Sequence, residues 1–245
     1  MTKAKQFAAA MPTEATLRRA VIDTCRRMNA LGINQGTSGN ASVRLDGDRF
    51  LITPSGVAYD AMTPAQIPTM TLGGRWYGAR RPSSEWRFHR DILAARPDAG
   101  AVIHTHGPLA TTLAVLRQDI PAFHYMVAVA GGDSIRCAPY ATFGTQALSD
   151  LALAALEGRR ACLLANHGLI AIGATLEKAL ALAVEVEALA GMYLRACAIG
   201  EPALLSAAQM DEALELFRTY GTPAFPDADL VHAGVSSPRR GGGGE

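Results

Sequence analysis

The sequence lacks an excess of charge of either sign, long apolar runs and an apolar N-terminal segment. In 245 residues, 23 Lys and Arg face 22 Asp and Glu, which leaves a formal net charge of +1. No basic or acidic block marks a surface for nucleic acid or for an anionic membrane. The apolar residues, 49% of the chain, form runs well below the roughly 18 residues of a membrane-spanning helix. With no signal-peptide core at the N-terminus, we expect a cytoplasmic protein that binds a small ligand.

Cysteine pairs are also missing. The four cysteines, at positions 25, 137, 162 and 197, are widely spaced, and none belongs to a C-x-x-C motif. This spacing indicates neither a disulfide framework nor a zinc site made of thiolates. We therefore expect these cysteines to be reduced thiols.

The pattern of apolar residues predicts an α/β protein with one main domain. Helical spacing marks residues 13–31, 145–156 and 175–198, and a further helix that follows Pro82 and has Glu85 in its first turn. Compact apolar runs predict strands at 41–45, 49–53, 101–105 and 160–165, the first two joined as a hairpin. Because strands and helices do not alternate regularly, we expect a three-layer α/β/α sandwich around a mixed, largely antiparallel sheet. Residues 1–220 would form this domain, and the Gly- and Pro-rich residues 221–245 a tail without its own core.

Three histidines and one glutamate are candidate metal ligands. His104 and His106 are two residues apart at the end of a predicted strand, so both imidazoles point to the same face. His167 closes another apolar run and can supply a third nitrogen, with Glu85 as an additional carboxylate. Three imidazoles with one open position are typical of catalytic zinc. The alternative for an isolated H-x-H is an ordinary polar strand end, but an unpaired imidazole on a buried strand would be costly.

Three loops rich in hydroxyls and glycine are candidate phosphate sites. They contain Ser38, Gly39 and Asn40, then Thr53 and Gly56, and finally Ser83 and Ser84 directly before Glu85. Backbone amides, hydroxyls and a helix N-terminus together bind a dianion without lysine or arginine. Each loop alone has an ordinary explanation as a turn or helix cap. Taken together, they predict a phosphate group within one sugar length of the Glu85 carboxylate.

These same residues carry a resemblance to a known family. The motifs are GTSGNASVR (36–44), ITPSG (52–56), PSSEWRFH (82–89), HTH (104–106) and NHGLIA (166–171). In this order they resemble the class II aldolase/adducin-head family. IPAFHYM (120–126) and CAPYATFGT (137–145) are similar to its zinc-dependent fuculose-phosphate aldolase branch. The resemblance implies an α/β/α fold, a cyclic homotetramer and active sites at subunit interfaces.

The resemblance also implies roles for individual residues. His104, His106 and His167 would be ligands of zinc, or of manganese or cobalt in its place, with Glu85 as the catalytic acid/base and a candidate fourth ligand. The Ser38–Asn40 loop, Thr53, Gly56, Ser83 and Ser84 would hold the substrate phosphate. Tyr125 matches a catalytic tyrosine that reaches a neighbouring subunit's site, and Tyr220 lies near a C-terminal tyrosine of the family. Asn166 departs from relatives that have a second histidine there.

The expected reaction is reversible cleavage of a ketose 1-phosphate to dihydroxyacetone phosphate and a short aldehyde. The candidate substrates are 5-methylthioribulose, 5-deoxyribulose and L-fuculose 1-phosphates, with a preference for the first two from overall resemblance. None of the motifs contains a lysine for a Schiff base. A methylthioribulose-phosphate dehydratase or a pentulose-phosphate 4-epimerase on the same fold is the alternative, although the epimerase type usually has Asp in place of Glu85. A non-catalytic scaffold like the adducin head is a further alternative, against which the three histidines and Glu85 count.

Overall fold

The computed structural model describes residues 12–219. The secondary-structure elements, in chain order, are α1 Glu14–Ala30, β1 Asn40–Arg44, β2 Arg49–Ile52, η1 Tyr59–Ala61, η2 Pro64–Gln66, β3 Thr69–Thr71, β4 Trp76–Tyr77, α2 Trp86–Ala95, β5 Ala101–Thr105, α3 Pro108–Val115, η3 Tyr125–Ala130, β6 Cys137–Ala138, α4 Gln146–Ala155, β7 Ala161–Leu164, β8 Gly168–Gly173, α5 Leu176–Ile199 and α6 Ala207–Thr219. The predicted tail 221–245 and Tyr220 lie outside the described residues.

The eight strands form one mixed sheet in the order β4-β3-β2-β1-β5-β8-β7-β6. Only β6 and β7 pair in parallel, and all other neighbours are antiparallel. This arrangement confirms the prediction of a largely antiparallel mixed sheet. Since antiparallel neighbours run in opposite directions, the end of β5 lies beside the beginnings of β1 and β8.

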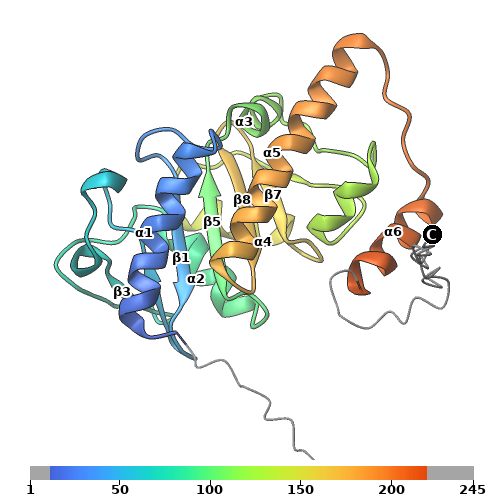
Figure 1. Cartoon of the computed structure of the whole chain (residues 1–245). Helices are drawn as coiled ribbons and strands as arrows, with labels where there is room; N and C mark the ends of the chain where they lie inside the picture. The colour runs from blue at the N-terminus through green and yellow to red at the C-terminus, as the bar shows by residue number, and fades with distance from the viewer. Residues whose placement is uncertain (1–11, 220–245) are drawn as a thin grey trace, which may run out of the picture.

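Helices cover both faces of the sheet, which makes the predicted three layers. Helices α1, α3 and α5 pack on one face, and Figure 1 looks onto it with α1 and α5 in front of the strands. Helices α2 and α4 pack on the other face around a second apolar cluster. Alternating strand residues divide between the two clusters, so both faces of the central strands are buried. Within the described residues, no helix has the length and apolar character needed to span a membrane.

The local signals in the sequence set most element boundaries. Thr13 caps α1 by accepting a hydrogen bond from the Thr16 amide, and Gly32 follows this helix with φ of +72°. One expectation is wrong in detail: Glu85 is the residue before the first turn of α2, which begins at Trp86. Helices α3 and α6 and strand β8 were not expected. Their runs of apolar residues are short or interrupted in the sequence. Packing on α5, η3 and the sheet stabilises these elements instead.

Candidate active site

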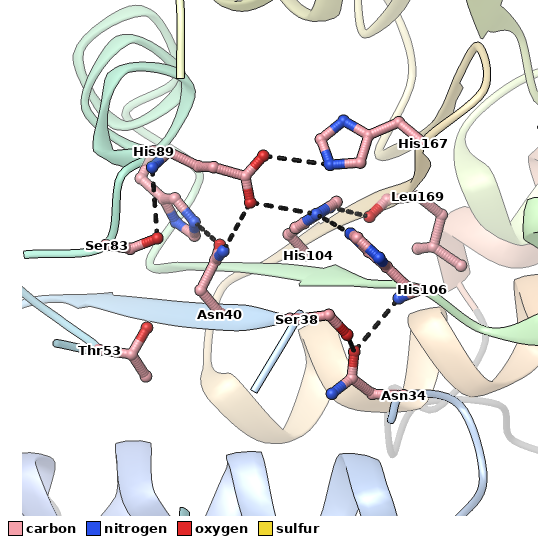
Figure 2. A network of polar contacts seen from close by, with 12 residues as sticks. Asn34, Ser38, Asn40, Thr53, Ser83, His89, His104, His106, His167 and Leu169 are labelled. Carbon is pink, nitrogen blue, oxygen red and sulfur yellow. Dashed lines mark hydrogen bonds and ion pairs between the residues drawn. The ribbon is translucent and has the colours of Figure 1, made fainter. Parts of the chain in front are cut away.

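The candidate ligands converge where three strands and one helix end or begin. The register pairs Asn40 at the start of β1 with His104 near the end of β5, and Thr105 with Leu169 of β8. His106 follows the end of β5, and His167 lies in the turn between β7 and β8. Residues far apart in sequence thus meet at one end of the central strands, as Figure 2 shows.

The three imidazoles lie close enough to share one ion. One ligand atom from each of His104, His106 and His167 lies within 4.8 Å of the others. The Nε2 atoms of His104 and His106 are 2.9 Å apart. The predicted triad is therefore assembled in the structure.

Glu85 lies against this triad and is almost fully buried, with 5% of its surface exposed. Its Oε2 lies 3.3 Å from His104 Nε2, and its Oε1 lies 3.1 Å from His167 Nε2. Oε2 accepts a hydrogen bond of 2.8 Å from the Asn40 amide, whereas Oε1 has no hydrogen-bond partner among residues 12–219. A buried carboxylate oxygen without a donor is costly unless a cation or a ligand completes its surroundings.

The protonation of the site favours a metal over a proton. His104 Nδ1 lies 2.9 Å from the Leu169 carbonyl oxygen and donates to it, which leaves the Nε2 lone pair facing the triad. Burial lowers the pKa of His104 to about 3, and burial with the nearby His167 lowers the pKa of His106. Neutral imidazoles with converging lone pairs are the ligand form that zinc requires.

Glu85 is held as a carboxylate by its surroundings. Burial would raise its pKa, but the imidazoles of His104 and His167 outweigh burial. The hydrogen bond from Asn40 adds to their effect, so that the pKa of Glu85 lies below its ordinary range. A carboxylate beside three imidazoles fits a divalent cation in both charge and ligand type.

A small pocket next to Glu85 brings the three predicted phosphate loops together. It encloses about 70 Å³, and its lining includes every residue predicted for phosphate: Ser38, Gly39, Asn40, Thr53, Gly56, Ser83 and Ser84. Gly39 packs so tightly that a Cβ there would lie 2.6 Å from Asn34 Oδ1 and 2.7 Å from the His104 carbonyl oxygen. The backbone of this loop therefore needs glycine to approach the end of β5.

A wider pocket of about 370 Å³ adjoins the small one, and the two share the lining residues Thr37, Ser38, Ser84 and Glu85. Its outer lining includes Tyr140 and Phe143, whose side chains are 55% and 65% exposed. Asn166 also lines it, with φ of +56°, and its Oδ1 accepts a hydrogen bond from Arg117. The two pockets make one cavity with a polar inner end and an aromatic outer end.

Tyr125 is the predicted catalytic residue that the structure does not bring to this cavity. It lies on η3, is 54% exposed, and lines a different pocket together with residues of α6.

Two residues of the site, Asn34 and His89, were not predicted from the sequence. His89 stands four residues after Glu85 inside the quoted motif, a helical spacing that could have drawn attention to it.

Comparisons with known proteins agree with this geometry. Residues 19–194 match the family model described as Class II Aldolase and Adducin N-terminal domain. The chain is 58% identical to 5-methylthioribulose-1-phosphate/5-deoxyribulose-1-phosphate aldolase of Rhodospirillum rubrum, over 85% of this chain and 94% of that one. It is 51% identical to L-fuculose phosphate aldolase of Escherichia coli strain K12, over 84% and 95% of the two chains.

A solved structure of an L-fuculose 1-phosphate aldolase has the same fold. It superposes with a TM-score of 0.80 at 38% sequence identity, covering 88% of this chain and 100% of the other. The family model also spans the three loops of the small pocket, the H-x-H motif and the histidine turn. With its assembled triad and buried glutamate, this chain belongs to the class II aldolase and adducin N-terminal domain family.

Proposed function

We propose that this protein is a metal-dependent aldolase that cleaves a ketose 1-phosphate reversibly into dihydroxyacetone phosphate and a short aldehyde. The observation that carries the proposal is the position of Glu85, a buried carboxylate between the histidine triad and the hydroxyl-lined pocket. A divalent metal held by His104, His106 and His167 would supply a Lewis acid that stabilises negative charge developing on the substrate oxygens. We propose zinc, with manganese or cobalt as replacements, because neutral imidazoles suit all three.

The inner pocket would bind the phosphate group. The amides of the loop that contains Gly39 and Asn40 are suited to this, as are the hydroxyls of Thr53, Ser83 and Ser84. Ser83 is buried and Ser84 is exposed in the cavity, and both lie just before Glu85, the N-cap residue of α2. Such an arrangement binds a dianion through dipoles and hydrogen bonds alone.

Glu85 would move the proton at the reacting carbon. Cleavage between carbons 3 and 4 leaves negative charge on the fragment that retains the phosphate. In the direction of carbon–carbon bond formation the Glu85 carboxylate would take the proton from carbon 3, and in cleavage Glu85 in its protonated form would return it. A base would remove the proton from the carbon 4 hydroxyl during cleavage, a role we propose for Tyr125.

The position of Tyr125 supports a site shared between subunits. Its side chain is half exposed on η3 and lies apart from Glu85 in the same chain. Together with the family resemblance, which implies a cyclic homotetramer with active sites at subunit interfaces, this position leads us to propose that Tyr125 of one subunit completes the cavity of the next. Sedimentation of the purified protein measures this directly, and a stable active monomer contradicts it.

Among the candidate substrates we favour 5-methylthioribulose and 5-deoxyribulose 1-phosphates over L-fuculose 1-phosphate. The outer end of the cavity has the aromatic side chains of Tyr140 and Phe143. Aromatic surfaces favour a methyl or methylthio group over a hydroxylated carbon. The relative from Rhodospirillum rubrum bears the name of an aldolase for these two substrates.

A coupled assay tests the proposal. Dihydroxyacetone phosphate release is measured from all three ketose phosphates, with and without a chelator, and the products are identified. We expect chelator-sensitive release, fastest from the two 5-substituted ribuloses. A dehydrated product without dihydroxyacetone phosphate would point to the dehydratase instead, and an epimerised pentulose to the epimerase.

Glu85→Gln tests the role of the carboxylate. The variant should keep its metal, measured by elemental analysis, while kcat falls about a hundredfold or more because acid/base catalysis contributes that much. Glu177→Gln, the same change at an exposed glutamate in the first turn of α5, is the matched control. Turnover by Glu85→Gln at the wild-type rate would remove Glu85 from the mechanism.

A further inference from the structure

A chain of hydrogen bonds lies behind Glu85, on the side away from the triad. The Asn40 Nδ2 group donates to Glu85 Oε2 at 2.8 Å, and Asn40 Oδ1 lies 2.5 Å from His89 Nε2. On the other side of the ring, His89 Nδ1 lies 2.7 Å from Ser42 Oγ. Figure 2 shows His89 and Asn40 side by side at this point. All four residues are buried, and the side chains of His89 and Ser42 have no exposed surface.

Two elements contribute to this chain. His89 lies on α2, one helical turn after Glu85, and Asn40 and Ser42 lie two residues apart on β1, so that both point to the same face of the sheet. The contacts therefore join α2 to the strand that pairs with β5. Asn40 occupies the centre, because its amide contacts the glutamate with one atom and the histidine with the other.

The direction of each hydrogen bond follows from the first one. Since Asn40 uses its NH₂ group on the Glu85 carboxylate, its oxygen must accept from His89, which therefore carries its proton on Nε2. His89 Nδ1 then has a lone pair and accepts from the Ser42 hydroxyl. Every hydrogen bond in this series is thus donated in the direction of Glu85.

We propose that His89 is a positioning residue for the catalytic carboxylate. By donating to Asn40 Oδ1, it fixes which end of the Asn40 amide faces Glu85. If the amide turned over, its oxygen would lie against a carboxylate oxygen, and two acceptors at that distance repel. His89 thereby keeps an N–H group on Oε2, so that Oε1 stays directed at His167 and the cavity.

This inference rests on the role proposed for Glu85, and it concerns a residue that itself lines neither of the two pockets. Asn40 also lines the small pocket, so a displaced Asn40 can be detected at both ends of the site. The alternative is that His89 only fills space: its ring stacks on Phe88 with centroids 4.7 Å apart. A filler would affect stability, and its effect on turnover would not depend on Asn40.

A double-mutant cycle separates the two explanations. His89→Phe keeps the ring and removes both nitrogens, and Asn40→Ala removes the amide that His89 orients. Each change should lower kcat about tenfold to a hundredfold, the usual effect of losing a partner that orients a ligand or catalytic group. The double variant should be no slower than Asn40→Ala alone. Independent, multiplying losses in kcat would overturn the proposal.

His89→Gln is the rescue variant. The glutamine amide can offer an N–H group near the position of the histidine Nε2, so it should recover most of the kcat that His89→Phe loses. Ile92→Ala, one turn further along α2 and fully buried, is the matched control. It should lower Tm while kcat stays at the wild-type value. A His89→Phe variant that behaves like Ile92→Ala contradicts the inference.

Ser42→Ala supplies the test if His89→Phe does not fold. Without the Ser42 hydroxyl, the tautomer of His89 is less firmly set, and we expect a loss of kcat of several-fold that disappears in the Asn40→Ala background. A loss of the same size in both backgrounds overturns the inference.

A structural readout makes the test independent of turnover. In crystals of metal-free His89→Phe, the contact between Asn40 Nδ2 and Glu85 Oε2 should be broken, whereas it should persist in His89→Gln. An intact contact in His89→Phe refutes the positioning role. Glu85→Gln in the same assays distinguishes the two proposals. If Glu85→Gln is active, Glu85 does not have the proposed role. If Glu85→Gln is inactive but the losses in the His89→Phe and Asn40→Ala cycle are independent, only the role of His89 is wrong.

Discussion

The two ends of the cavity are built in opposite ways. At the inner end, Glu85 and His104 are buried between β1, β5 and α2, and their neighbours are hydrogen-bonded to one another. At the outer end, Tyr140 and Phe143 lie in a loop before α4 and are more than half exposed. The inner end depends on the fold itself, whereas the outer end can vary without disturbing the core. In the proposed function, buried residues carry the chemistry and a few exposed ones set the selectivity.

The removal of one imidazole should lower activity the most, because it takes a proposed metal ligand from the inner end of the cavity. We expect His104→Ala to lose bound metal and to lower kcat about a thousandfold or more, because Lewis-acid stabilisation is worth several kcal/mol. Elemental analysis and the dihydroxyacetone phosphate assay measure both losses. The control is His124→Gln, which replaces the N-cap histidine before η3, outside the triad, and should keep the metal. Full metal content in His104→Ala would contradict the triad assignment.

A smaller effect should follow from crowding the phosphate loop. Gly39→Ala places a methyl group 2.6 Å from Asn34 Oδ1 and 2.7 Å from the His104 carbonyl oxygen, so the loop must shift. Overpacking of this kind costs about 1–3 kcal/mol of stability. We expect a lower Tm, and binding of inorganic phosphate weakened about tenfold in calorimetry, since 1.4 kcal/mol corresponds to that factor.

Gly47→Ala is the matched control for this change. Gly47 lies in the turn between β1 and β2, and a Cβ there would meet nothing within 4 Å. It should leave both Tm and phosphate binding close to the wild type. If Gly39→Ala binds phosphate as tightly as Gly47→Ala does, the loop is not the phosphate site, and the inner end would consist of the metal centre alone.

The same contrast between the two ends explains what the sequence could predict. His104 and His106 were predictable because the period of a strand puts both on one face, and His167 because it follows an apolar run. The fold class followed from the irregular order of strands and helices. The hydrogen bonds that link Ser42, His89 and Asn40 were not predictable. They depend on where α2 lies against β1, and no local pattern encodes that contact.

The position of Glu85 shows the same limit on a smaller scale. The sequence places it near the start of a helix, but whether it lies inside the first turn or before it depends on the contact of Ser83 with the backbone. In the structure Ser83 Oγ accepts a hydrogen bond from the Glu85 amide, and the helix begins at Trp86. Outside the first turn, the carboxylate can turn towards the imidazoles of the triad.

The smallest expected effect lies at the outer end and would sharpen the comparison. Phe143→Ala removes the most exposed aromatic ring of the cavity, so it should leave metal content and Tm unchanged. An apolar contact of this size is worth about 1–3 kcal/mol in discrimination between substrates. We therefore expect kcat/KM for 5-methylthioribulose 1-phosphate to fall about tenfold relative to that for L-fuculose 1-phosphate.

Tyr77→Ala is the control and should not alter this ratio, because Tyr77 is also an aromatic residue more than half exposed but lies on the edge strand β4. A uniform loss on all substrates in Phe143→Ala would mean that the outer ring supports the chemistry rather than the choice of aldehyde. The proposed division between the two ends of the cavity would then be wrong, because an exposed residue would contribute to catalysis together with the buried ones. A shift confined to the ratio would instead assign the choice of aldehyde to side chains that the fold leaves free to change.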